Sequence, residues 1–108
     1  MATTQDNRTA VRRLELHNLL LSFCPNCYFQ PPESFKLTYP CIVYNRSSSN
    51  TRYADNNPYS FRYSYDITAI SRDPDSDTPR KIAQLPLCRF NRHFTKDNLN
   101  HDIFTLYW

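Results

Sequence analysis

The stretch that decides the fold is residues 59–71, YSFRYSYDITAIS. From position 61 onwards, aromatic and aliphatic residues alternate with polar ones. Successive side chains of a β-strand point to opposite faces, so this two-residue period predicts a strand with one buried face. The buried face would carry Phe61, Tyr63, Tyr65, Ile67 and Ala69, and the other face would carry Arg62, Ser64, Asp66 and Thr68.

A helix and another strand are expected before this stretch. Asp6 or Asn7 can cap the start of a helix that ends before Pro25, with good helix formers between them. A connection with several prolines follows, and the β-branched run 41–44, CIVY, predicts a strand. The polar segment 45–58 is then expected to be a loop of about fourteen residues, a length at which a connection often has a function.

The expected helix is apolar on two sides. At about 100° per residue, four apolar residues fall on one side and four roughly opposite. The first set is Ala10, Val11, Leu14 and Leu21, and the second set is Leu16, Leu19, Leu20 and Phe23. A helix of this kind needs two partners to bury it. We expect one partner to be the sheet and the other to be a neighbouring subunit.

A turn and a short helix are expected after the long strand. The run 73–77, DPDSD, has the composition of a turn. Thr78 and Pro79 fit the N-cap and the first position of a helix, and Pro86 should end that helix. The helix is therefore expected to be about two turns long and to include Ile82 and Leu85.

The carboxy-terminal segment predicts an antiparallel hairpin. Alternation returns at residues 103–108, and turn residues lie at 96–98. The partner strand would have one face made of Cys88, Phe90, Arg92 and Phe94. The chain is thus expected to be one α+β domain, residues 1–108, in which a mainly antiparallel sheet is covered on one face by the N-terminal helix and the short second helix.

Composition narrows the function classes. The 108 residues include no glycine, which excludes the Gly-rich loops that cradle phosphates in nucleotide enzymes. The net charge of +3 is too small to imply a nucleic-acid partner. The N-terminus lacks the layout of a secretory signal, and no apolar run is long enough to span a bilayer. We therefore expect a chain made in a cytoplasm, with four reduced cysteines and no membrane partner.

Two motifs have partial metal-binding patterns. Cys24 and Cys27 have the spacing of a zinc or redox pair, but a second close pair is missing, so buried thiols acting as small apolar residues fit better. The acids in 73–77 resemble part of a calcium loop, yet Thr78 stands where that loop needs glycine. Roles in the turn and in helix capping fit these acids better.

Catalytic and base-stacking patterns are also incomplete. His93 and His101 flank the last turn and could lie near each other, but no signature of a nucleophile with a base accompanies them. The aromatic residues of 59–65 alternate with Arg and Ser and could stack bases, although a half-buried strand shows the same pattern. We expect no catalytic residue, no cofactor and no metal, so the protein should act by contacts with other chains.

Several motifs between residue 39 and the end of the chain together resemble one protein family. They are Tyr39-Pro40-Cys41-Ile42-Val43-Tyr44, Arg46-Ser47-Ser48, Ala54-Asp55-Asn56-x-Pro58-Tyr59, Arg72-Asp73-Pro74-Asp75-Ser76 and Phe90-x-Arg92-His93-Phe94-x-x-Asp97-Asn98-Leu99-Asn100-His101-Asp102. With these motifs the chain resembles the tail terminator (tail completion) proteins in the neck of long-tailed bacteriophages.

The resemblance implies a structural protein of the virion, assembled in the host cytoplasm. It would form a homo-oligomeric ring, expected to be a hexamer, that caps the tail tube, ends tail growth and joins the tail to the head connector. DNA would pass through the lumen without sequence-specific binding. The family has no catalytic motif to match. A head-closure (stopper) protein of the neck is the nearest alternative, and a small nucleic-acid-binding module or a small hydrolase or metal protein are others.

The residues expected to contact partners come from three places. A ring needs one patch that fits a different patch on the next copy, and the two-sided helix and a free sheet edge could supply them. The polar segment 45–58 could order against the tail tube or the connector. The candidate interface residues are Leu16, Leu20, Phe23, Arg46, Arg52, Tyr53, Asp55, Phe104, Leu106 and Trp108.

Overall fold

The strand predicted from residues 59–71 lies at the centre of the sheet. The computed structural model describes residues 4–47, 52–53 and 61–108. The predicted strand is divided into β4 (Phe61–Arg62) and the longer β5 (Ser64–Ser71). Tyr65, Ile67 and Ala69 are buried in the core, which confirms these three positions of the expected face. Ser64, expected on the polar face, is also buried.

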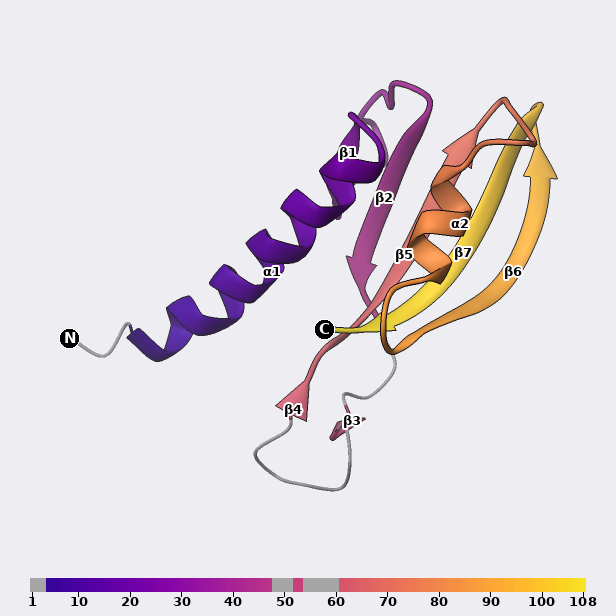
Figure 1. Cartoon of the computed structure of the whole chain (residues 1–108). Helices are drawn as coiled ribbons and strands as arrows, with labels where there is room; N and C mark the ends of the chain where they lie inside the picture. Colours follow the sequence, from indigo (N-terminus) through magenta and orange to yellow (C-terminus); the bar gives the residue numbers. More distant parts are fainter. Residues whose placement is uncertain (1–3, 48–51, 54–60) are drawn as a thin grey trace.

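Five strands form the main sheet in the order β1-β2-β5-β7-β6 (Figure 1). The strands β2 (Cys41–Arg46), β5, β7 (Leu99–Tyr107) and β6 (Cys88–Lys96) pair antiparallel with their neighbours. The strand β1 (Cys27–Phe29) pairs parallel with β2. Sequence reasoning missed β1 because three residues before a proline-rich connection are too few to show alternation.

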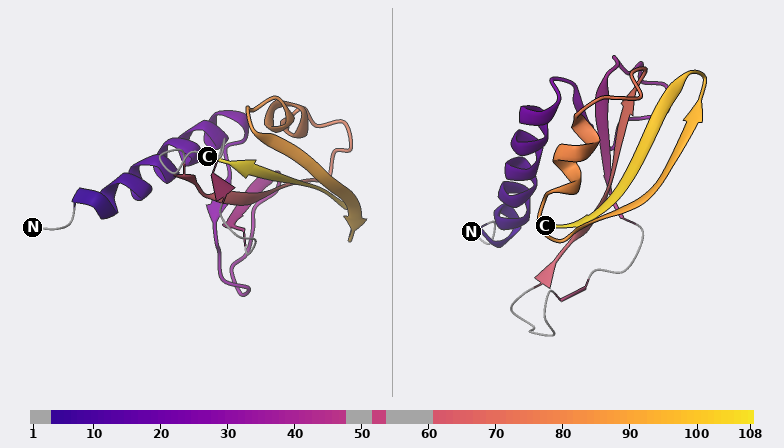
Figure 2. Two further views of the ribbon diagram at one scale, coloured as in Figure 1. Left: turned by 90° about the horizontal axis from the view of Figure 1, so that it is seen from below. Right: turned by 45° about the vertical axis from the view of Figure 1, so that its right-hand side comes forward.

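Both helices lie on the same face of the sheet (Figure 2). They are α1 (Thr4–Phe23) and α2 (Thr78–Ala83). The α+β fold with an N-terminal helix and a short second helix is thereby confirmed. The predicted start of α1 at Asp6 or Asn7 is wrong, since the helix begins at Thr4. No helix among the described residues is long and apolar enough to cross a membrane.

The second helix differs from its prediction by small shifts at both ends. Its N-cap is Asp77 rather than Thr78, and Pro79 still occupies the first turn. The helix ends at Ala83, before Leu85, so it is shorter than the two turns expected. Ile82 is its one buried residue, because so short a helix can direct few side chains at the sheet.

The core lies between the helices and the sheet. Leu16 and Leu20 of α1 are fully buried, and they share one cluster with Ile67 of β5 and with Phe104 and Leu106 of β7. Aromatic rings extend this cluster towards β1. Phe29, Tyr44 and Tyr65 contact one another at centroid distances of 4.9, 6.1 and 6.5 Å, in tilted and edge-to-face geometries that aromatic rings prefer.

The predicted carboxy-terminal hairpin is confirmed. Asp97 and Asn98 join β6 to β7, and their φ angles are +55° and +62°. Two successive residues with positive φ are typical of a type I′ turn. The twist of this turn matches the twist of the two strands that it joins. Asp and Asn tolerate this region better than most other residues, so they can replace glycine in a chain that has none.

A bulge in β6 changes the predicted faces of that strand. Phe90 pairs with Phe104, but the next paired residue is Arg92, which lies opposite Ile103. Asn91 is the extra residue, and an extra residue reverses the alternation beyond it. The prediction that Cys88, Phe90, Arg92 and Phe94 share a face is therefore wrong. Cys88 and Phe90 face the helices, whereas Arg92 and Phe94 face the other side.

The expected loop at 45–58 contains regular structure. The strand β2 continues to Arg46, and β3 (Arg52–Tyr53) pairs antiparallel with β4. The prediction that residues 45–58 form a loop over their whole length is therefore wrong. Asp55 and the other residues at 48–51 and 54–60 lie outside the described part of the chain.

Candidate functional site

Three segments that are far apart in the sequence meet at one end of the sheet, drawn uppermost in Figure 1. They are residues 39–41 at the start of β2, residues 71–78 between β5 and α2, and residues 100–102 of β7. We call this region the motif end, because each segment belongs to a motif of the family resemblance. Topology explains the meeting, since antiparallel β2 and β7 start where β5 stops.

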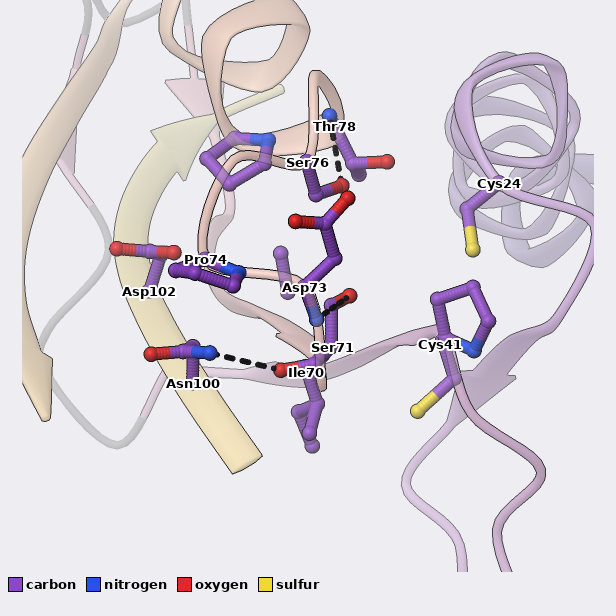
Figure 3. A pocket seen from close by; sticks show the side chains of 13 residues that line it. Cys24, Cys41, Ile70, Ser71, Asp73, Pro74, Ser76, Thr78, Asn100 and Asp102 are labelled. Atoms are coloured by element: carbon purple, nitrogen blue, oxygen red, sulfur yellow. Dashed lines mark hydrogen bonds between the residues drawn. The ribbon is translucent and has the colours of Figure 1, made fainter. Parts of the chain in front are cut away.

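The turn at residues 71–78 is held by its own side chains (Figure 3). The Oγ of Ser71 accepts the backbone N–H of Asp73 at 3.0 Å, and Oδ1 of Asp73 accepts the N–H of Asp75 at 2.9 Å. The N–H of Thr78 donates to Oγ of Ser76 at 3.3 Å. Side-chain bonds of this kind define Asp- and Ser-rich turns. The carboxylate of Asp73 therefore acts in the turn, as the sequence favoured over a calcium role.

Further hydrogen bonds tie the turn to its neighbours. The side-chain amide of Asn100 donates to the carbonyl of Ser71 at 3.2 Å (Figure 3). The hydroxyl of Thr78 donates to the carbonyl of Phe23, the last residue of α1, at 3.4 Å. The side chain of Asn26 donates to the carbonyl of Pro40 at 3.0 Å. The motif end is thus a braced surface.

The motif end contains little enclosed space. The cavity between Cys24, Cys41, Asp73 and Asn100 holds about 10 Å³, which is at most room for one water molecule. Beside it lies an open depression of about 340 Å³ lined by Tyr39, Pro40, Ser71, Arg72, Asp73 and Ser76. The guanidinium of Arg72 sits 5.5 Å from the centroid of the Tyr39 ring. This shape suits contact with another surface better than enclosure of a small substrate.

Burial affects the ionisation of three of the four thiols. Burial, with the nearby Cys24, raises the pKa of Cys27 and of Cys41 to about 12. Burial also raises the pKa of Cys88. A thiol must ionise to act as a nucleophile or a metal ligand, and a raised pKa opposes this. Cys24 belongs to the core cluster, and Cys27 and Cys88 pack against it. Among the residues that the structure describes, no three His, Cys, Asp or Glu side chains are placed to hold a metal ion.

The histidines that could have formed a pair lie on opposite faces of the hairpin. Nδ1 of His93 lies 2.7 Å from Oδ1 of Asp102, the residue directly opposite it on β7. His101 instead stacks on Phe94, with ring centroids 4.4 Å apart and 8° between the planes. Neighbouring register positions point to opposite sides of a sheet, so the two imidazoles cannot act together.

Four of the candidate interface residues are not at the surface. Leu16, Leu20, Phe104 and Leu106 are at most 1% exposed. The prediction that they meet a partner is wrong for the folded chain, because they form the contact between α1 and the sheet. The periodicity of α1 identified two apolar sides correctly but could not tell which one the sheet would cover.

The other side of α1 is the exposed one. Val11 and Leu14 are about half exposed, at 52% and 51%, and Leu21 is 38% exposed. We call these three residues the outer stripe. Among the described residues, two further apolar side chains are exposed where β6 begins, Leu87 at 49% and Phe90 at 52%. These two apolar surfaces belong to different elements, and the end of the chain lies between them. The N–H of Tyr107 donates to the carbonyl of Leu87 at 3.1 Å, and Trp108 donates to the carbonyl of Arg12, next to Val11.

The remaining candidate residues have mixed positions. Phe23 and Trp108 are partly buried against the core, and the indole N–H of Trp108 donates to the carbonyl of Arg12 at 2.7 Å. Arg46 is exposed, with its guanidinium 3.9 Å from the centroid of the Tyr63 ring. Only the backbone of Arg52 and Tyr53 is described, as the strand β3. Asp55 lies outside the described residues.

Comparisons with protein-family models, with curated proteins and with solved structures found no match for this chain. An assignment of function must therefore rest on the motifs of the sequence and on the surfaces described above.

Proposed function

We propose that this protein is a ring-forming structural subunit of the neck of a long-tailed bacteriophage. The ring, expected to be a hexamer, caps the tail tube, ends its growth and joins the tail to the head connector. The observation that carries the proposal is the motif end. Motifs that contribute to the family resemblance are separated by up to about sixty residues of sequence, yet they form one braced surface. A single docking surface would account for the motif residues at this end of the sheet.

The two exposed apolar surfaces support the ring. In a ring, a patch on one copy fits a different patch on the next copy. The outer stripe of α1 and the pair Leu87 and Phe90 are two such patches, on separate elements of the chain. Exposed apolar side chains are common at contacts between subunits. We assign the contact between neighbouring copies to these surfaces and the contact with the connector or the tube to the motif end.

A head-closure protein of the same neck is the second candidate. It would also form a ring around the DNA and would also dock by one end. The two roles differ in the partner, because a terminator remains on isolated tails and a head-closure protein remains on isolated heads.

Native mass measurement and electron microscopy test the proposal. The purified full chain should give a closed oligomer, and rings should be seen at the ends of tails to which the chain is added. A chain that stays monomeric both alone and with tails would refute the proposal. Rings found on head connectors and never on tails would support the head-closure role instead.

A further inference from the structure

The cationic residues of β6 share one face of the sheet. In the register of the hairpin, Arg89 lies opposite Thr105, Arg92 opposite Ile103 and Lys96 opposite Leu99. Residues directly opposite each other in an antiparallel pair point to the same side. These β7 residues alternate with Phe104 and Leu106, which are buried under the helices. Arg89, Arg92 and Lys96 therefore line the face that no described helix covers, and we call them the cationic strip.

The bulge at Asn91 creates this arrangement. Arg89 and Arg92 are three positions apart, so in a regular strand they would point to opposite faces. The extra residue turns Arg92 to the side of Arg89. The side-chain amide of Asn91 donates to the hydroxyl of Thr105 at 2.6 Å and fixes the bulge on this face.

The strip carries more positive than negative charge. One carboxylate shares its face, since Asp66 of β5 lies opposite Thr105, with its Oδ1 3.5 Å from the Thr105 hydroxyl. The sequence of β6, CRFNRHFTK, contains three Lys or Arg and no acid, and the whole chain has a net charge of +3. One strand thus holds an excess of positive charge equal to that of the entire protein. No ion pair joins Arg89, Arg92 or Lys96 to a carboxylate among the described residues. The Arg92 guanidinium sits 5.3 Å from the Phe94 centroid, which positions its charge without neutralising it.

The strip lacks what a protein partner would need. A protein interface has an apolar centre surrounded by polar groups. The exposed large apolar side chains of the described residues are Val11, Leu14, Leu21, Phe35, Leu87 and Phe90, and none belongs to the strip. Phe94, Leu99 and Ile103 lie on the same face as the strip, and each of them is only partly exposed. Nucleic-acid interfaces, in contrast, are polar and strongly positive, as this strip is.

We infer that the cationic strip contacts the phosphate backbone of double-stranded DNA without reading its sequence. The strip runs for roughly 20 Å along β6, a length over which a duplex carries about 12 negative charges. The ring of Phe94 is stacked on His101 and contacts the Arg92 guanidinium. We therefore do not assign it to stacking on a base. The inference deepens the proposed function, since it assigns the residues that would meet the DNA inside the ring.

Salt-dependent binding of the full chain to DNA is the first test. A fluorescein-labelled duplex of 20 base pairs is titrated with the protein, and anisotropy gives the affinity at several NaCl concentrations. Three phosphate contacts predict a slope of log K against log[salt] of about −2.7, or roughly a 40-fold loss of affinity between 50 and 200 mM. Changing the base sequence should leave the affinity unchanged. Sequence-dependent affinity, or no binding even at 50 mM, would overturn the inference.

Two variants of equal charge locate the contact. Arg89→Gln, Arg92→Gln and Lys96→Gln together should abolish most of the salt slope, and Arg92→Gln alone should reduce it by about 1. Arg12→Gln, Arg80→Gln and Lys81→Gln remove the same charge from exposed positions on the two helices and should keep the slope. Equal losses in both triple variants would show an effect of net charge alone and would overturn the inference.

Assembly assays separate this inference from the proposed function. The strip variant should still form the oligomer and still cap tails. A strip variant that binds DNA normally but fails to cap tails would identify an acidic protein as the partner and overturn the inference. A wild-type chain that binds DNA through the strip but never forms a ring would refute the proposed function and leave the inference standing.

Discussion

The two faces of the β6–β7 hairpin are made from alternate residues of the same two strands, yet they differ in chemistry. The helix-side face carries the buried Phe104 and Leu106. The open face carries Ile103 and Thr105, which are half buried, beside the exposed Arg89 and Arg92. The first face contributes to stability through burial, and the second leaves polar and charged groups in solvent. The comparison teaches that a change of one register position moves a side chain from the core to the solvent-exposed face.

The largest test of this comparison uses one substitution on each face of the sheet, with Ile67 of β5 lying opposite Phe104 on the helix side. Ile67→Ala removes a fully buried helix-side side chain and should lower the free energy of unfolding by about 3–5 kcal/mol, through lost burial and a cavity. Ile103→Ala makes the same chemical change on the open face and should lower it by about 1 kcal/mol, because Ile103 is half exposed already. Urea denaturation measures both. Equal losses would mean that the open face is covered within the chain.

A second test applies the same comparison to α1. Leu16→Ala should reduce the free energy of unfolding by about 2–4 kcal/mol, since Leu16 is fully buried against the sheet. Leu14→Ala, in the outer stripe, should change it by less than about 0.5 kcal/mol while weakening the oligomer measured by native mass. An unchanged oligomer with Leu14→Ala and Val11→Ala combined would remove the outer stripe from the subunit contact.

Short sequence patterns predicted most of the helices and strands, because the residues that define each of these elements are close together in the chain. Alternation found β5 and the hairpin, and Thr78 and Pro79 located the start of α2 to within one residue. The motif end could not be predicted, since it depends on which strands are neighbours, and pairing of distant segments leaves no local pattern. Likewise, the sequence showed that α1 is apolar on two sides. Which side is buried depends on how α1 packs on the sheet, and the sequence of the helix does not determine this.

The bulge shows most directly where sequence reasoning stopped. A single unpaired residue, Asn91, reverses the faces of Arg92 and Phe94, and Asn is compatible with either a regular or a bulged strand. The net charge of the chain also failed to predict the cationic strip, because a total does not show where the charges lie. The second half of the chain has seven cations and seven acids, so its total hides the three cations that one strand gathers on one face.

Alkaline pH should lower stability through buried ionisable groups, several of which lie on the helix-side face. Cys27, Tyr44 and Cys88 lie on this face by register, and burial raises the pKa of Cys27 and of Tyr44 to about 12. The unfolded thiol ionises near 9.0, so above that pH the unfolded state binds fewer protons than the folded state. Stability should therefore be intact below pH 9 and should fall as the pH rises towards 12.

A cysteine variant checks the origin of that fall. Urea midpoints measured with reductant from pH 8 to pH 11 should decline less steeply for Cys27→Ala than for the wild-type chain. Cys27→Ala will itself lower stability at pH 8, so the slope and not the absolute value is the readout. Parallel slopes in the two proteins would show that Cys27 is not desolvated in the folded state.

The smallest expected effect concerns the bond that fixes the bulge. The amide of Asn91 donates to the hydroxyl of Thr105 at 2.6 Å, and this bond is exposed, so it should contribute only about 0.5–1 kcal/mol. Asn91→Ala and Thr105→Val, measured singly and together by urea denaturation, give the interaction energy as the departure from additivity. Because Thr105 also approaches Oδ1 of Asp66 at 3.5 Å, the single Thr105 variant alone would overstate the energy of the Asn91–Thr105 bond.

Strict additivity would mean that the backbone of β6 holds the bulge without the side chain of Asn91. Arg92 would then keep its place on the open face in the Asn91→Ala variant, and the salt slope of DNA binding would be unchanged.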